Sequence, residues 1–295
     1  MKYTYYPGCA LHATGVAYEK SIRAVFAKLG AELVELEDWN CCGATAYTSV
    51  KKTVAYAISA RNLALAEKAG LDMVAPCSGC YYTLNRTREA LSTHAELRAN
   101  VGAALAEAGL ELGLNTRVRH PLEVLLTDFG IDRIVAARTH SIADFRPACY
   151  YGCQIVRPFP AVDDDPENPM AMERLLSALG ASPVDYPPKV RCCGGMLVAT
   201  VPEVARELCV QLIDWAQERG ANCIVTVCPL CQANLDLLNV DHGNGEHRRI
   251  PILYFSQVLG LALGCSREEV GLQHGLAPVT LGATPLPLGV RGGTR

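Results

Sequence analysis

The sequence lacks the features that would mark a nucleic-acid-binding, secreted or membrane-spanning protein. Its 27 basic and 30 acidic residues form no long run of like charge, so no face for nucleic acid is expected. Residues 1–15 lack the continuous apolar core of a secretory signal. The most apolar late stretch, 250–265, is interrupted and shorter than the roughly 20 residues that span a bilayer. We therefore expect a cytoplasmic protein without membrane insertion, and a buried helix over 250–265.

Cofactor motifs for an independent electron supply are also missing. The chain has no C-x2-C-x2-C run of the ferredoxin type, and no G-x-G-x-x-G motif that follows a strand for a flavin or dinucleotide. Any redox chemistry of this chain must therefore draw its electrons from partner proteins.

Cysteine is abundant, with 14 residues in a chain of 295. Disulfide frameworks persist mainly in secreted proteins, so in a reducing compartment these cysteines indicate metal or cluster binding instead. Ten of them form two sets with the same pattern. The first set is Cys9, Cys41, Cys42, Cys77 and Cys80, and the second is Cys153, Cys192, Cys193, Cys228 and Cys231.

The two sets indicate an internal duplication. Cys9 and Cys153 are 144 residues apart, whereas the other four equivalent pairs are 151 residues apart, which places one seven-residue length difference after the first cysteine. We expect a first half over 1–143, a second half over 144–276 and a loosely ordered tail over 277–295. The segments 120–125 and 250–255 look like the matched final segments of the two halves.

Periodicity within each half predicts an α/β fold. In the first half we expect strands and helices to alternate over 2–6, 17–29, 32–36, 50–69 and 71–75, followed by a helical stretch over 82–113. In the second half the same plan gives 146–151, 170–179, 183–186, 202–219 and 223–227. This order predicts parallel sheets, with each C-x2-C just past the carboxyl end of a strand, where open α/β sheets gather ligands.

Five thiols in each half allow three kinds of site. Four thiolates complete a zinc tetrahedron, and C-x2-C is a common half of such a site, but five is one too many. Thiolates also hold iron–sulfur clusters, and an ordinary cubane takes four of them. A redox dithiol is the third possibility. Adjacent cysteines such as Cys192 and Cys193 do not easily form a disulfide with each other, but both can face one cluster.

The sequence around the cysteines resembles that of the CCG-domain proteins, and most closely that of the B subunit of heterodisulfide reductase. The resemblance extends over about residues 3–275, and the motifs that carry it are Tyr-Pro-Gly-Cys at 6–9, Ala-Cys-Tyr-Tyr-Gly-Cys at 148–153, Arg-Cys-Cys-Gly-Gly at 191–195, Cys-Pro-Leu-Cys at 228–231 and Pro-Ile-Leu-Tyr-Phe-Ser-Gln at 251–257. It implies two duplicated Rossmann-like parallel-sheet domains related by a pseudo-twofold axis, with a cluster from each at the interface. It also implies that each cluster is a noncubane [4Fe-4S] cluster at which disulfides are cleaved.

Carried over position by position, the resemblance gives the first cluster to Cys9, Cys41, Cys42, Cys77 and Cys80, and the second to Cys153, Cys192, Cys193, Cys228 and Cys231. The chain departs from the family around Cys153, where Tyr150 and Gln154 stand in flanking positions that often carry histidine. His12 follows Cys9 closely and is a candidate proton donor, or an ordinary loop residue. Arg157 and Arg191 are candidates for binding an anionic substrate, or surface arginines.

Cys149, Cys209, Cys223 and Cys265 lie outside both sets. The last three are expected to be small buried residues, and Cys149 to be either inert or a reactive neighbour of a cluster.

The resemblance implies a soluble complex with ferredoxin-like and flavin-bearing partner subunits. The substrate would be a disulfide or, in sulfur oxidation, sulfur bound to a lipoate-carrying protein, and the altered flanks of Cys153 favour sulfur metabolism. Two alternatives stay open: the iron–sulfur subunit of a glycolate or succinate oxidoreductase, and a non-catalytic, zinc-stabilised assembly module.

Overall fold

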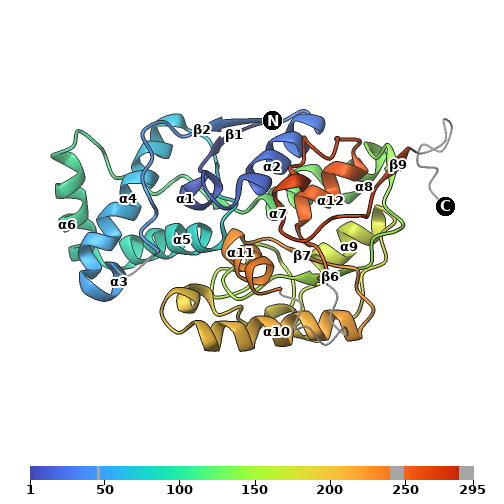
Figure 1. Cartoon of the computed structure of the whole chain (residues 1–295). Coiled ribbons are helices and arrows are strands. Elements are labelled where there is room, and N and C mark those ends of the chain that lie inside the picture. Colours follow the sequence, from blue (N-terminus) through green and yellow to red (C-terminus); the bar gives the residue numbers. More distant parts are fainter. Residues whose placement is uncertain (45–46, 240–248, 286–295) are drawn as a thin grey trace.

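The computed structural model describes residues 1–44, 47–239 and 249–285 (Figure 1). The strands are β1 Lys2–Tyr5, β2 Glu32–Glu35, β3 Met73–Val74, β4 Val118–Arg119, β5 His140–Ser141, β6 Pro147–Tyr150, β7 Cys223–Thr226, β8 Ile252–Tyr254 and β9 Thr284–Pro285. The helices are α1 Gly8–Leu11, α2 Val16–Lys28, α3 Tyr47–Val50, α4 Lys52–Ala69, α5 Ser78–Thr93, α6 Ala95–Ala106, α7 Pro121–Val124, α8 Ile131–Ala136, α9 Ala171–Ala178, α10 Pro202–Glu218, α11 Pro229–Leu238 and α12 Phe255–Ala262. Four tighter or wider turns complete the list: a π-helix at Leu125–Phe129 and 3₁₀-helices at Pro187–Val190, Gly195–Ala199 and Leu272–His274.

Two parallel sheets form the centres of the two halves. The first has the order β2-β1-β3-β4 and the second the order β6-β7-β8, and every pairing in both is parallel. β6 and β7 are buried along their whole length, as expected for parallel strands covered on both faces. The predicted α/β class with parallel sheets is confirmed.

The repeat is visible in the backbone as well as in the sequence. Helices α2 and α9 each end at a leucine followed by a glycine with positive φ, Gly30 at 74° and Gly180 at 93°. Helices α4 and α10 are likewise followed by Gly70 at 64° and Gly220 at 75°. Residues with a Cβ rarely adopt this conformation, so the same chain reversal recurs where the sequence repeats.

Two predictions for the second half are wrong. No strand forms over 183–186 in the described chain: Val184 N donates to Pro147 O at 3.0 Å, but Pro183 and Pro187 have no N–H to continue a ladder. The segment 250–265 is not one helix, because Ile252–Tyr254 is strand β8 and helix α12 begins only at Phe255.

The final segments of the two halves occupy similar places in the fold, but the residues aligned by their sequences are not structurally equivalent. Pro121 follows β4 and begins α7, whereas Pro251 precedes β8. In the first half, His120 follows the last strand and is the N-cap of the next helix. In the second half, Tyr254 ends the last strand and is the N-cap of the next helix. These two residues, rather than the prolines, are therefore the structural equivalents.

Each half contributes a helix that covers the other half. Helix α12 packs on α2, where Ser21 Oγ and Ser256 Oγ are 2.6 Å apart. Helix α8 packs on α9, and Arg138 beyond α8 donates to Leu179 O at the end of α9, at 2.8 Å. Figure 1 shows α2 beside α12 in the middle of the molecule. One hydrophobic core therefore spans both halves.

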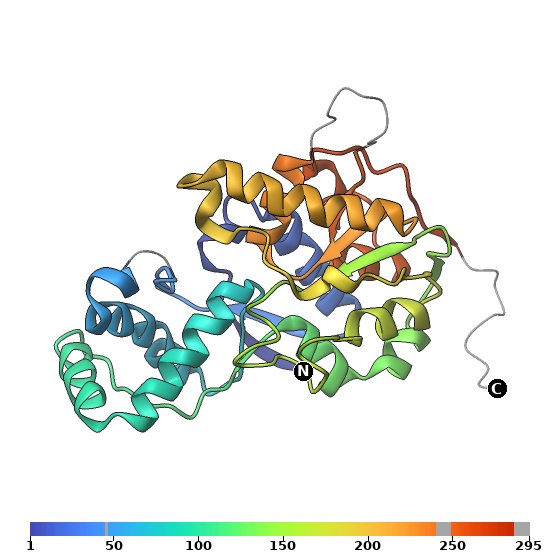
Figure 2. The same cartoon turned by 90° about the horizontal axis from the view of Figure 1, so that it is seen from below.

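Helices α4, α5 and α6 have their own apolar cluster at one end of the molecule, on the left in both views, and α3 lies against α4 (Figure 2). At the other end, β9 pairs antiparallel with β5, so residues 284–285 of the predicted tail lie against 140–141. The rest of the predicted tail, 286–295, lies outside the described residues.

Candidate functional site

Each C-x2-C sits at the start of a helix that follows a buried strand. Cys77 is the N-cap of α5 and Cys228 the N-cap of α11, both with extended backbone. Cys80 and Cys231 are then the third residues of these helices. The free N–H groups and the positive dipole end of a helix favour negative charge, but hydrogen bonds to neighbouring thiols and burial raise the pKa of Cys77, Cys80 and Cys231, and only that of Cys228 is lowered.

A tyrosine fixes each loop that carries a cysteine pair. The hydroxyl of Tyr6 donates to Asn40 O, and that of Tyr150 donates to Arg191 O, both at 2.7 Å. Both tyrosines are fully buried, and both accepting residues directly precede a pair, so the two bonds are equivalent. From the sequence, Tyr6 stood out only as part of a motif and Tyr150 only as a departure from the family, although the two are separated by the same 144 residues as Cys9 and Cys153.

A glycine leaves room beside the sulfurs in each half. Gly8 and Gly152 both have positive φ, 68° and 70°. A Cβ on Gly8 would lie 2.9 Å from Cys80 Sγ, and one on Gly152 would lie 3.1 Å from Cys231 Sγ. A side chain at either position would collide with a cysteine sulfur. Steric space therefore explains why glycine stands directly before Cys9 and Cys153.

In the first half, four of the five thiols form one chain of contacts. The pKa of Cys42 is lowered to about 4 because its sulfur accepts hydrogen bonds from Cys41 and Cys80. Cys80 in turn contacts Cys77. Cys9 lies exposed at the rim of the group.

In the second half, the thiols form two contacting groups. Cys193 Sγ lies 3.4 Å from Cys231 Sγ, and this contact lowers the pKa of Cys193. A hydrogen bond from Cys153 lowers the pKa of Cys192 to about 6. Asn234 supports the loop by donating to Cys193 O at 3.2 Å and to Gly195 O at 2.8 Å.

The two sets meet at their C-x2-C segments. The thiols of Cys77 and Cys228 are within hydrogen-bonding reach of each other, and the pKa of Cys77 is raised because it donates to Cys228. Both thiols are buried. The ten cysteines singled out by spacing therefore lie in one region of the molecule, where the halves join.

This donor set fits a sulfur-rich cluster. In each half, thiols of one set contact one another beside a glycine that leaves them space, and thiolates are the ligands that hold iron–sulfur clusters. Over residues 1–44, 47–239 and 249–285, no three His, Cys, Asp or Glu side chains are arranged around one point as a single metal ion would need.

The four remaining cysteines are buried. Burial raises the pKa of Cys149 and of Cys223 well above that of a free thiol, so both stay protonated. Cys209 donates to Cys193 O at 3.3 Å and thus touches the backbone of a cysteine pair. Cys265 is part of the large core cluster.

The three polar candidates from the sequence lie on the surface. His12 Nε2 is 3.7 Å from Glu35 Oε1, and the His12 ring packs edge-on against Trp39 at 5.3 Å between centroids. Arg157 is paired with Glu167 at 2.6 Å. Arg191 is exposed, directly before the second cysteine pair. The geometry thus gives His12 and Arg157 charged partners outside the two cysteine sets.

A small cavity of about 50 Å³ lies beside the first cysteine pair and includes a residue of the second half. Its walls include Ala44, Lys52, Arg86 and Gln154. A Cβ on Gly79, between Cys77 and Cys80, would lie 3.2 Å from Gln154 Oε1, so the Gln154 side chain reaches the first C-x2-C. Lys52 and Arg86 have no carboxylate partner among the described residues. Sequence reasoning missed both cations because each lies within a helix and belongs to no motif.

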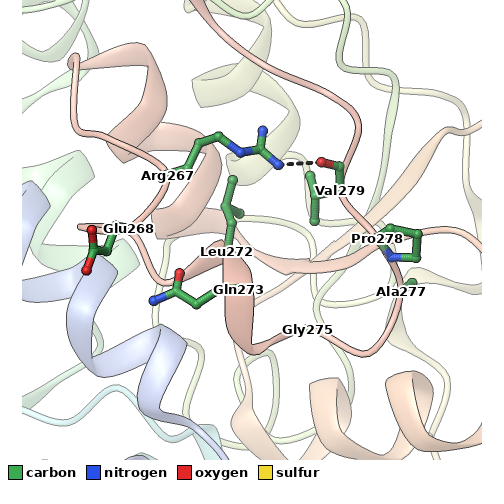
Figure 3. Close-up of a pocket in the computed structure, with 8 residues that line it drawn as sticks. All are labelled: Arg267, Glu268, Leu272, Gln273, Gly275, Ala277, Pro278 and Val279. Carbon is green, nitrogen blue, oxygen red and sulfur yellow. Dashed lines mark hydrogen bonds between the residues drawn. The ribbon is translucent and has the colours of Figure 1, made fainter.

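A wider cavity, of about 530 Å³, lies near the carboxyl end of the described chain (Figure 3). It is lined by residues 267–279 and holds no cysteine. Arg267, its main cation, already donates to Leu281 O at 2.7 Å and to Val279 O. We assign the chemistry to the cysteine region instead. Among the described helices, none has the length and apolar character needed to cross a bilayer.

Comparison with protein families identifies the repeated unit. The profile of a cysteine-rich (CCG) domain matches residues 3–85 and 148–236, one copy in each half. These matches include all ten cysteines of the two sets.

Two relatives are similar along nearly their whole length. The 8-methylmenaquinol:fumarate reductase membrane anchor subunit of Wolinella succinogenes is 32% identical over 95% of this chain and 98% of its own. The B subunit of the ferredoxin/F(420)H(2)-dependent CoB-CoM heterodisulfide reductase of Methanosarcina acetivorans is 31% identical over 92% of this chain and 93% of its own.

Among solved structures, a hypothetical protein from Helicobacter pylori has the same fold, with a TM-score of 0.76 and 15% identity over 95% of this chain. The present chain spans about half of that protein, 52% of its length.

Proposed function

We propose that this chain is the catalytic iron–sulfur subunit of a complex that cleaves or forms sulfur–sulfur bonds. The chain belongs to the family of duplicated cysteine-rich (CCG) domains, which includes the B subunit of heterodisulfide reductase. The observation that carries this proposal is the contact between Cys77 and Cys228, which joins two complete five-cysteine sets across the halves. The relatives indicate an oxidoreductase, and we propose that it acts on sulfur groups as one subunit of a complex.

Two noncubane [4Fe-4S] clusters are the proposed cofactors. Cys9, Cys41, Cys42, Cys77 and Cys80 would hold the first, and Cys153, Cys192, Cys193, Cys228 and Cys231 the second. When bound, an iron–sulfur cluster supplies reversible one-electron transfer. The role of the chain's own residues is to hold both sets of thiolates at the starts of α5 and α11 and to bury Cys77 and Cys228 away from water.

Two electron carriers at one site suit disulfide cleavage. The reaction consumes two electrons and two protons and breaks one S–S bond to give two thiols. The electrons come from partner subunits, for which a ferredoxin-like protein and a flavin-bearing protein are the proposed candidates. We place the reacting sulfurs between the two cysteine sets, so that each faces one of them.

The cavity beside the first set, of about 50 Å³, can take one anionic group of a substrate but not a whole coenzyme, because pockets for such molecules usually enclose about 300–1,000 Å³. Lys52 and Arg86 put positive charge in its wall without a carboxylate to neutralise it, and Gln154 brings in a polar group from the second half. An anionic tail on the substrate, such as a carboxylate, would be attracted there, because guanidinium and ammonium groups pair with such anions. A coenzyme disulfide with an acidic tail has this character. We also propose that the protein acts in the cytoplasm and serves sulfur metabolism.

A second function is favoured by one relative. The similarity to a subunit of a fumarate reductase, over 98% of that subunit, supports an electron-transfer role in a succinate- or glycolate-type oxidoreductase. In that role the same two cysteine sets relay electrons, and no disulfide is cleaved. A zinc-stabilised module is the non-catalytic alternative.

Metal analysis and turnover separate these functions. We expect anaerobically prepared protein to hold about eight irons and matching acid-labile sulfide, from two four-iron clusters. Zinc without sulfide would refute both redox functions. With a reduced viologen as donor, the loaded protein should reduce a disulfide that carries a carboxylate. Full iron content without any disulfide turnover would favour the electron-relay function.

Single-set variants test whether both sets are needed. Cys42→Ser and Cys193→Ser should each remove one cluster, leave the other spectroscopically intact and abolish disulfide turnover. Cys265→Ser, a buried cysteine of the general core, is the matched control and should keep eight irons and full activity. A Cys42→Ser or Cys193→Ser variant with near-normal turnover would show that one set suffices and that the shared site is wrong.

A further inference from the structure

His120 lies where the two halves meet and is fully buried. It follows β4 and is the N-cap of α7, whose Leu122 N donates to His120 Nδ1 at 3.2 Å. Because Nδ1 accepts this bond, the ring proton of the neutral imidazole is on Nε2. Burial lowers the pKa of His120 to about 4, so the ring is neutral at physiological pH.

The Nε2–H group faces two backbone carbonyls, one from each half. Nε2 is 2.9 Å from Pro76 O and 3.3 Å from Val227 O. Pro76 directly precedes Cys77, and Val227 directly precedes Cys228. One N–H group is therefore shared between equivalent positions of the duplicated chain, at the two points where the C-x2-C segments begin.

The Val227 carbonyl is held by the first half through more than one side chain. Tyr18 OH donates to it at 3.1 Å, and Ser78 Oγ at 3.4 Å. The Tyr18 ring also stacks on Tyr254, with centroids 4.2 Å apart and planes inclined by 3°. His120, Tyr18 and Ser78, all of the first half, therefore share the two lone pairs of this carbonyl. Three donors around one oxygen leave it little freedom to move relative to the first half.

The two halves do not contribute equally to this contact. Tyr254 occupies in the second half the place that His120 occupies in the first, at the end of the last strand and before the next helix. Its hydroxyl donates to Gln232 Oε1 at 3.3 Å, within its own half, rather than to the carbonyls before the cysteines. Among the described side chains, His120 contacts both the carbonyl of Pro76 and that of Val227, whereas Tyr18 and Ser78 hold only the carbonyl of Val227.

We propose that His120 is a positioning residue that sets the separation of the two cysteine sites, by holding the backbone before Cys77 and before Cys228 with the same N–H group. The inference deepens the proposed function, since a reaction that uses both sites needs a fixed distance between them. It does not require iron to be bound, because every contact that carries it lies in the chain itself.

Two substitutions separate this role from the capping of α7. In His120→Gln the amide nitrogen can take the place of Nε2, so the donor to the carbonyls is kept and the cap is lost. In His120→Asn the shorter side chain can take the place of Nδ1, so the cap acceptor is kept and the donor is lost. His94→Asn, at an exposed position, is the control for the substitution itself.

The iron-free readout is the rate at which diamide, a thiol oxidant, links Cys77 to Cys228 in a Cys80→Ser, Cys231→Ser background, scored by peptide mass spectrometry. We expect His120→Asn to slow this link roughly fivefold to tenfold, the population change that follows from losing one buried hydrogen bond. His120→Gln should stay within about twofold of the parent chain. Equal rates in all variants, or a slower link in His120→Gln than in His120→Asn, would overturn the proposal.

A second readout uses the loaded holoprotein with its cysteines intact. His120→Asn should keep its full iron content but change the magnetic interaction between the two clusters in the EPR spectrum, whereas His120→Gln should keep the parent spectrum. An unchanged spectrum in His120→Asn would count against the proposal. If neither redox function holds and no iron binds, the iron-free measurement still decides the role of His120.

Discussion

Loss of the buried ion pair at Lys189 is expected to destabilise the second half strongly. Lys189 Nζ is 2.6 Å from Glu173 Oε1 and 3.1 Å from Pro169 O, and only 4% of the lysine side chain and 6% of the glutamate side chain are exposed. Tyr151 OH donates to the other carboxylate oxygen at 2.6 Å. Lys189→Met removes the cation and leaves the carboxylate buried without a counter-charge, which typically costs about 3–5 kcal/mol.

The first half supplies a matched control. Asp38 is 151 residues before Lys189 and, like it, stands three residues ahead of a cysteine pair. Its partner is Arg61, but 76% of the Asp38 side chain and 30% of that of Arg61 are exposed. An exposed pair contributes about 0.2–1 kcal/mol, so Asp38→Asn should change the free energy of unfolding several times less than Lys189→Met.

The assay is urea unfolding of the iron-free chain. A loss of about 3 kcal/mol lowers the unfolding midpoint by about 1 M, for a denaturant slope near 3 kcal/mol per M. The double variant Lys189→Met, Glu173→Gln should recover part of this loss, because it leaves no unpaired charge. A Lys189→Met midpoint equal to that of Asp38→Asn would refute the reasoning.

Three further outcomes are expected. Arg86→Gln should raise KM for a disulfide with a carboxylate by about tenfold and leave KM for a neutral disulfide unchanged, since a charge-assisted hydrogen bond is worth about 1.5–3 kcal/mol; equal changes for both substrates would contradict the cavity assignment. Tyr6→Phe and Tyr150→Phe should each lower the free energy of unfolding by about 1 kcal/mol, the value of one buried hydrogen bond, and a clear difference between them would show that the two bonds are not equivalent. A hydrogen bond from Arg119 lowers the pKa of Asp128, so this carboxylate stabilises the fold above its unfolded pKa of about 3.9 and the stabilisation is lost as the pH falls towards the folded pKa. Asp128→Asn should therefore reduce stability at pH 7 and flatten the acid limb of a stability–pH curve, whereas an unchanged acid limb would assign acid unfolding to other groups.

The sequence was sufficient for the α/β class and for the positions of most helices and strands, because spacing and glycine punctuation are local properties. It also led to the ten cysteines that the structure gathers where the halves join, since a duplicated pattern with constant offsets needs no tertiary information. The failed strand over 183–186 shows the limit of this reasoning: the repeated plan of the first half favoured a strand, but Pro183 and Pro187 lack the N–H groups that a ladder needs.

His120 could not have been found in the same way. It has no repeated counterpart, because Tyr254 stands in the equivalent place, and its partners are carbonyls 44 and 107 residues away in the chain. Lys52 and Arg86 were missed for a related reason, since only the packing of α4 against α5 brings them to one cavity.

The cover of α2 by α12 has a consequence for biosynthesis. During translation the first half is complete near residue 143, but the helix that covers α2 is finished only at residue 262. At roughly 5–20 residues per second this interval of about 120 residues lasts about 6–24 s, during which Tyr18, Ser21 and Val25 lack their partners Tyr254, Ser256 and Gly260. We expect the nascent chain to need a holding chaperone over this interval, and a transcript truncated after the first half to yield an aggregating fragment rather than a soluble one-cluster protein.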